Sequence, residues 1–191
     1  MLAAVFVAAS PRPVAAVTYN WNGSNPPSTT SAWNSSGNWS PIGLPAGPDD
    51  VQFNVPTWWP GFTPPPPPPL IDVDLVNGGV GNSVNTISFN AAAPDYYVID
   101  SFNSLMGSGP TDALNVGSWI EKKGANSVTI AYLNLTCPTL TNYAGNLSFI
   151  GTNIVNIAGD VEIKGGIVCV TVDAALISSF SAANWNVRGG L

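Results

Sequence analysis

The sequence has 191 residues, enough for one domain, and only 8% of them are charged while 45% are hydrophobic. Its formal net charge of −6 comes from 11 acidic and 5 basic residues, which argues against nucleic acid or an anionic membrane surface as a partner. Low charge combined with abundant Asn, Thr and Gly favours an exported all-β protein over a cytoplasmic enzyme.

Residues 1–16 are predicted to be a signal peptide. An apolar run over residues 2–9 is too short to span a bilayer, and Val14-Ala15-Ala16 supplies small residues that a signal peptidase accepts. The alternative, a buried N-terminal strand, is disfavoured because Pro11 and Pro13 interrupt the run. No basic residue precedes the apolar run, so we expect the natural start to lie upstream. The leader predicts a secreted or cell-surface location.

Residues 17–54 are predicted to form a cap with an aromatic core. Aromatic residues recur here within a run of Ser, Asn, Gly and Pro, which suits neither a helix nor a flexible linker. We therefore expect Trp21, Trp33 and Trp39 to pack together in place of regular secondary structure. The stretch ends in an alternating strand, and Asp49 and Asp50 are assigned to the turn that enters it.

Residues 55–70 are predicted to be a Pro-rich inserted loop. The six prolines at 64–69 must adopt a polyproline II rod, roughly 19 Å long at about 3.1 Å per residue, which cannot join a sheet. We interpret the rod as a stiff exposed loop, and a spacer or a docking site for an aromatic groove is the alternative. Trp58, Trp59 and Phe62 precede it, either stacked on the prolines or exposed as an apolar patch.

Residues 71–191 carry short β-type runs separated by Gly and Asn turns, and no helical period of useful length is found. The predicted strands cover residues 84–89, 96–99, 114–116, 127–130, 132–136, 146–150, 153–157, 160–164 and 167–172. Phe89, Val116, Ile130, Leu135 and Phe149 recur at loosely rung-like intervals. This recurrence favours an all-β solenoid of stacked rungs over the alternative, a β-sandwich.

The two cysteines, Cys137 and Cys169, both lie in apolar strand-like runs. We interpret them as free thiols of the core, where cysteine behaves as a small hydrophobe. A disulfide between them is the alternative in an oxidising compartment.

The cap and the first strands resemble a known family. The residues that carry the resemblance are Trp21, Gly23, Trp33, Asn38, Trp39, Pro45, Asp49, Val51 and Phe53. Their pattern is similar to the start of exported bacterial proteins with autotransporter-associated β-strand repeats, and residues 71–75 and 84–89 are similar to the first two rungs of those proteins. The resemblance covers about residues 17–90 and implies a right-handed parallel β-helix displayed or secreted outside the cell.

Two departures from that family matter. An insertion occupies residues 58–69, where the family passes briefly into its first rung, and the glycine-rich repeat that names the family is not evident before residue 191. The chain ends inside a strand pattern, so we expect the rungs over residues 71–191 to be incomplete. An autotransporter barrel or a sorting anchor would then lie further along.

Few residues are candidates for catalysis or metal binding. The sequence contains no histidine and so lacks His-dependent triads and His–metal sites. Asp72 and Asp74 lie two apart on a strand and project from one face, as a solvated face or as candidate calcium ligands. Asp160 and Glu162 form a second pair, which we assign to a solvated strand face with Lys164 offsetting their charge. We predict no cofactor, with calcium at Asp72 and Asp74 as the alternative.

We therefore predict a structural or adhesive module without catalytic activity. The alternative is a glycan-binding module that uses Trp58, Trp59 and Phe62. A less favoured alternative is a β-helical polysaccharide lyase or hydrolase. It would need a groove with acids plus Arg or Lys, and Lys122, Lys123 and Lys164 are the only such bases among the predicted rungs. The expected partners are extracellular polysaccharide, other surface proteins or further copies of the chain. We expect neither nucleic acid nor membrane insertion of this segment.

Overall fold

The computed structural model describes residues 15–21, 31–54, 70–75, 82–90, 96–100, 112–151, 154–171 and 179–188. Within these ranges the protein is all-β, as predicted, and its one helix is the short 3-10 turn η1 (Ser36–Asn38). None of the described residues belongs to a helix long and apolar enough to cross a membrane. The predicted Pro-rich loop lies outside these ranges, apart from Leu70 at the start of a strand.

The strands form two sheets, which we name sheet A and sheet B. Sheet A contains β1 (Thr18–Trp21), β3 (Trp39–Ser40), β4 (Asp50–Phe53), β6 (Asn82–Phe89), β8 (Ala113–Lys122), β10 (Asn134–Cys137), β11 (Thr139–Asn142), β13 (Ile154–Ile163) and β15 (Ser179–Val187). Sheet B contains β2 (Ser31–Ala32), β5 (Leu70–Asp74), β7 (Tyr96–Asp100), β9 (Ser127–Ala131), β12 (Asn146–Ile150) and β14 (Ile167–Thr171).

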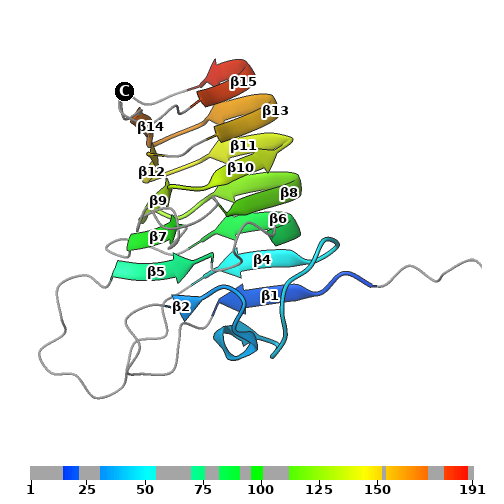
Figure 1. Ribbon diagram of the computed structural model, residues 1–191. Helices are drawn as coiled ribbons and strands as arrows, with labels where there is room; N and C mark the ends of the chain where they lie inside the picture. The colour runs from blue at the N-terminus through cyan, green and yellow to red at the C-terminus, as the bar shows by residue number, and fades with distance from the viewer. Residues whose placement is uncertain are drawn as a thin grey trace, which may run out of the picture.

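The chain alternates between the two sheets, and neighbouring strands within each sheet are parallel. From β4 the chain enters sheet B as β5 and returns as β6, which pairs in parallel with β4; β7 then pairs in parallel with β5. The alternation continues to β15, except that β10 and β11 follow each other within sheet A, and β1–β3 is the single antiparallel pair among the described strands. Figure 1 shows the strands stacked in successive layers, from β1 and β2 at one end to β15 at the other.

The long strands of sheet A bend at aligned positions. The register shifts between Val84 and Thr86 on β6 and between Ile157 and Asp160 on β13. In the layer between β8 and β13, a break at Pro138 separates β10 from β11. The Gly159 amide donates to the Pro138 carbonyl at 2.7 Å, and a Cβ at Gly159 would lie only 2.8 Å from that oxygen. Glycine therefore allows the layers to approach at the bend.

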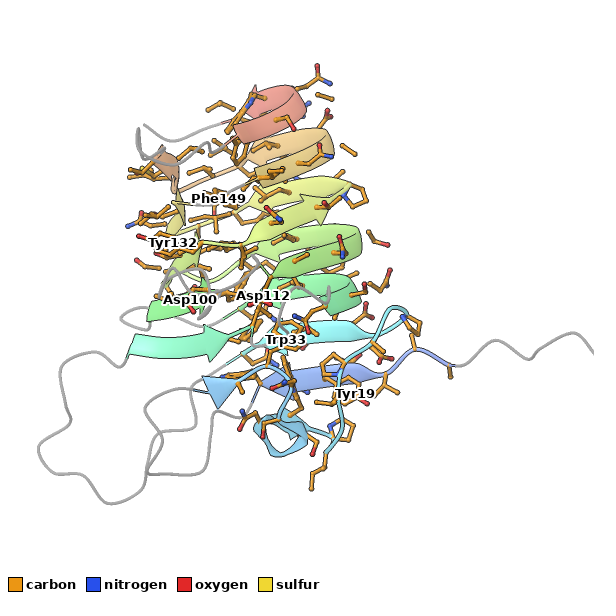
Figure 2. All side chains as sticks on the ribbon, viewed as in Figure 1. Tyr19, Trp33, Asp100, Asp112, Tyr132 and Phe149 are labelled. Carbon is orange, nitrogen blue, oxygen red and sulfur yellow. The ribbon has the colours of Figure 1, made fainter. Side chains whose placement is uncertain are left out.

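Apolar side chains form columns that run through the layers. One column in sheet A consists of Val51, Ile87, Ile120, Leu140 and Val161, which are in register and at most 1% exposed. In Figure 2, Phe149 of β12 lies between the two sheets, where its column faces the column of sheet A. Burying one side chain of this size stabilises the fold by about 1.5–3 kcal/mol. The alternation of apolar and polar residues in each strand thus holds the layers together.

The predicted packing of the three tryptophans is confirmed, but Trp21 lies in β1 and Trp39 in β3, so the indoles do not stand in place of regular secondary structure. Trp21, Trp33 and Trp39 are 4%, 2% and 0% exposed, so all three indoles belong to the core. The Trp39 ring packs edge-on against Trp21 and Trp33, with ring centroids 4.7 and 4.9 Å apart, and its Nε1 donates to the Trp33 carbonyl at 2.8 Å. Phe53 continues the cluster by stacking on Phe89 with a centroid separation of 4.9 Å. The cap therefore joins the first layers through aromatic contacts.

Several expectations need correction. Cys137 and Cys169 are both free, but only Cys137 is buried; Cys169 is exposed on β14, because its side chain alternates to the outer face. The two strands predicted over residues 153–157 and 160–164 are the single bent strand β13. The strands β11 and β15 and the second half of β8 were not predicted. Asp50 is the first residue of β4 rather than part of the preceding turn.

The predicted rung interval was wrong because it was measured between residues that belong to different sheets. Phe89 belongs to sheet A and is in register with Lys122, whereas Ile130 belongs to sheet B and is in register with Phe149. Val116 pairs with Val84 of the same sheet. The five residues used for the interval therefore do not form one column.

Candidate ligand-binding surface

The outward side chains of the last four layers of sheet A form a regular surface, which we call the outer grid. Its members are Trp119, Glu121 and Lys123 of the β8 layer, Thr139, Thr141 and Tyr143 of the β11 layer, Asp160, Glu162 and Lys164 of the β13 layer, and Asn184, Asn186 and Arg188 of the β15 layer. They project outward because they alternate with buried residues such as Ile120, Leu140 and Val161.

Backbone hydrogen bonds between layers continue past the ends of the strands, so the side chains in the last column of the grid remain in register. The amides of Tyr143, Lys164 and Arg188 donate to carbonyls of the preceding layer, each at 2.8 Å. Three successive layers thus present a long polar or aromatic side chain at the same position. Among the described residues, every basic side chain other than that of Lys122 lies in this column.

Two clusters of an aromatic ring, a glutamate and a lysine occupy the grid. Lys123 pairs with Glu121, and its Nζ lies 5.8 Å from the centroid of the Trp119 ring. Lys164 pairs with Glu162 at 3.0 Å, and its Nζ lies 4.8 Å from the centroid of the Tyr143 ring. The hydrogen bond to Glu162 is the main cause that raises the pKa of Lys164. These contacts fix the rings relative to the carboxylates.

Other outward carboxylates connect neighbouring layers. Asp160 accepts from the side-chain amides of Asn184 at 2.8 Å and Asn186 at 3.2 Å. Asp50 accepts from Asn85 at 2.9 Å and from the Thr86 hydroxyl at 2.6 Å. In each case the acceptor lies on one layer and the donors on the next, so these carboxylates act as links along the stack.

Asp49 serves the cap in a similar way. Its Oδ1 accepts from the Val17 amide and its Oδ2 from the Ala46 amide, both at 2.9 Å, and the residue is 7% exposed. The carboxylate therefore closes the turn before β4, which agrees with the turn assignment made for Asp49 from the sequence.

Lys122 is a buried cation between two layers. Its side chain is 0% exposed, and its Nζ donates to the carbonyls of Gly124 and Ala144, the latter at 2.8 Å, and to Asn126 Oδ1 at 3.0 Å. Desolvation by burial lowers the pKa of Lys122 to about 8. Because all three acceptors lie in turns that lead from sheet A to sheet B, Lys122 ties two successive turns together.

Asn142 repeats this arrangement one layer further on. It is in register with Lys122 and is also 0% exposed. Its Nδ2 donates to the Gly165 carbonyl at 2.9 Å. A polar side chain at this position thus fastens the turn in successive layers, which marks Lys122 as a structural cation.

The predicted site residues have different outcomes. Trp58, Trp59 and Phe62 lie outside the described residues. The backbones of Asp72 and Asp74 belong to β5, where Asp74 is in register with Asp100, but their side chains are not among those described. No group of three or more His, Cys, Asp or Glu residues that could hold a metal is found among the described residues. The calcium site and the glycan site at Trp58 remain predictions.

Asp160 and Glu162 do share the outer face of β13 with Lys164, as predicted. Trp119, Glu121 and Tyr143 were missed as members of a site. The available signal was the repeated spacing Trp119-x-Glu121-x-Lys123 and Thr139-x-Thr141-x-Tyr143, which places every second residue on one face of a strand.

Comparison of the chain with protein-family models, curated proteins and solved structures finds no match.

Proposed function

We propose that this chain is a secreted or cell-surface structural and adhesive module, built on a right-handed parallel β-helix with a Trp-rich cap and without catalytic activity. The observation that carries the proposal is the aligned stack of parallel layers, in which apolar columns fill the interior and polar residues such as Asp50 and Asp160 link neighbouring layers. In such a stack most interactions join one layer to the next, and this arrangement suits a rigid scaffold.

The strand pairing favours the helix over the β-sandwich. Sandwiches are built from antiparallel strands joined by hairpins and Greek-key connections. Here consecutive strands pass to the other sheet, and each then pairs in parallel with the strand of the next layer. A right-handed coil is the hand expected for parallel strands joined by crossover connections.

The lyase or hydrolase alternative is weaker but keeps one supporting contact. Lys164 lies 3.0 Å from Glu162, so a base does stand beside one of the paired carboxylates. Asp160, the other member of the pair, is occupied by Asn184 and Asn186. Glu162 is not enclosed, since its side chain is 31% exposed. A reaction that excludes water is not favoured there.

The proposal predicts an extracellular protein that leaves polysaccharides intact. The full chain, incubated with neutral and acidic polysaccharides, is expected to release no new reducing ends and no unsaturated products absorbing near 235 nm. Cleavage by the wild type that is lost in Glu162→Gln would overturn the non-catalytic assignment. Retention in the bacterial cytoplasm of the epitope-tagged protein, expressed from its natural upstream start, would overturn the assigned location.

A further inference from the structure

We propose that the outer grid binds an uncharged polysaccharide, with the sugar chain lying along the strand direction between Trp119 and Tyr143. The proposal deepens the adhesive function inferred above, because it names the ligand class and the surface. Its aromatic pair, Trp119 and Tyr143, is separate from the predicted pair Trp58 and Trp59, which lies outside the described residues. The surface consists of the β8, β11 and β13 layers of the grid.

The charge balance of the surface argues for an uncharged ligand. In its β8, β11 and β13 layers the surface carries three acids (Glu121, Asp160 and Glu162) and two bases (Lys123 and Lys164), a net charge of only −1 on a protein of net charge −6. Each glutamate is paired with a lysine on its own layer, so no single-sign field draws an ion to the grid. A hydroxyl group both donates and accepts, and it therefore matches a face where carboxylates alternate with ammonium groups.

The polar groups of the grid are accessible, which distinguishes them from the interlayer links. The lysine side chains are 50% and 40% exposed, and those of their glutamate partners 21% and 31%. Exposed ion pairs contribute about 0–1 kcal/mol to stability, so a ligand can share these groups at small cost. Thr141 lies in register between Glu121 and Glu162 and adds a hydroxyl to the same row.

The rings of Trp119 and Tyr143 flank the row of polar side chains that contains Thr141. Trp119 is in register with Thr139, and Tyr143 lies four residues further along that layer, so their backbones are about 13 Å apart along the strand direction. Tyr143 is 37% exposed and its hydroxyl lies 3.5 Å from Glu121 Oε1. Aromatic faces pack on the apolar C–H faces of sugar rings, and here a sugar would displace the exposed lysines that lie over the two rings. The separation of the rings suits a chain of several sugars rather than a single one.

Affinity electrophoresis of the full chain tests this surface, with hydroxyethyl cellulose, galactomannan and xyloglucan as uncharged probes and polygalacturonate as the acidic probe. We expect retardation by at least one uncharged polymer, a Kd at least tenfold weaker for Trp119→Ala/Tyr143→Ala, and little change between 50 and 500 mM NaCl. Trp185→Ala is the matched control, because Trp185 is a 47% exposed indole of β15 outside the grid. Its Kd is expected to equal that of the wild type.

Three results would overturn the proposal: no retardation by any uncharged probe, undiminished binding by a folded double variant, or binding of polygalacturonate alone that weakens with salt. Glu121→Gln/Glu162→Gln keeps both rings, so it provides a second variant if the double alanine variant loses its circular dichroism spectrum. We expect it to weaken binding severalfold as well. Failure here leaves the scaffold proposal standing, since secretion and the absence of cleavage are measured independently.

Discussion

Replacing Lys122 by methionine is expected to destabilise the fold, and to do so more strongly at high pH. The substitution leaves the Gly124 and Ala144 carbonyls and Asn126 Oδ1 without their donor. At about 2 kcal/mol for each stranded acceptor, the loss is about 6 kcal/mol. Methionine also removes the desolvation cost of the ammonium, which is about 3 kcal/mol for a pKa lowered from 10.5 to about 8. We therefore expect a net loss of about 3 kcal/mol at pH 7.

The pH dependence of the free energy of unfolding follows from the lowered pKa of Lys122. Because the pKa of Lys122 is lower in the folded state, the unfolded chain binds more protons above about pH 8, and stability rises as the pH increases towards 10.5. Between pH 7 and pH 9.5 this term adds about 2 kcal/mol to the wild type and nothing to the methionine variant. The difference between the two proteins is therefore expected to widen to about 5 kcal/mol.

Urea denaturation of both proteins at the two pH values measures this difference. Burial raises the pKa of Cys137 to about 12, so that thiol lowers stability as the pH rises above its unfolded value, but the effect is common to both proteins and cancels. Lys123→Met is the control, because its ammonium is 50% exposed and its loss is expected to cost at most about 1 kcal/mol. A difference between wild type and Lys122→Met that stays constant or shrinks at pH 9.5 refutes the assignment of Lys122 as a desolvated cation.

Three further substitutions or modifications test other parts of the fold. Trp39→Ala is expected to lower the free energy of unfolding by about 3–5 kcal/mol, because it empties the centre of the cap; a loss below about 1 kcal/mol in urea denaturation would contradict the packing. In native protein a thiol reagent is expected to label Cys169 quickly and Cys137 only after unfolding, as peptide mass spectrometry can resolve; equal labelling rates would be inconsistent with their burial. Gly145→Ala is expected to cost more than about 2 kcal/mol, since φ is +67° and a Cβ would meet the Asn126 carbonyl and lie 2.7 Å from Lys122 Nζ; an unchanged melting temperature would contradict this turn geometry.

The sequence predicted the features that depend on local pattern. Trp21, Trp33 and Trp39 could be assigned to a core because indoles in a run of turn-forming residues have no other way to be shielded. The strand at Asn146–Ile150 was predicted correctly because apolar and polar residues alternate with period two. The outward position of Glu162 followed from the same rule.

The remaining features depend on register, which the sequence does not display. Paired residues such as Ile87 and Ile120 are separated by a longer stretch of chain than Ile120 and Leu140, because the connections between layers differ in length. No fixed repeat therefore reveals which residues meet. The sequence identifies Lys122 only as one of the bases among the rungs, and its burial depends on the stacking of its turn on the turn of the next layer.

The stacking of sheet A in parallel layers is tested most directly by distances along one outward column. Gln52, Ser88, Glu121, Thr141, Glu162 and Asn186 are in register on successive layers, and all except Ser88, which is 5% exposed, suit labelling. In a Cys137→Ala/Cys169→Ser background, spin labels at pairs of these positions can be measured by pulsed electron paramagnetic resonance. With about 4.8 Å between layers, backbone separations of about 19 Å for Gln52 and Glu162 and about 24 Å for Gln52 and Asn186 are predicted. Distances that do not increase with the number of layers, as in a β-sandwich, would contradict the parallel β-helix.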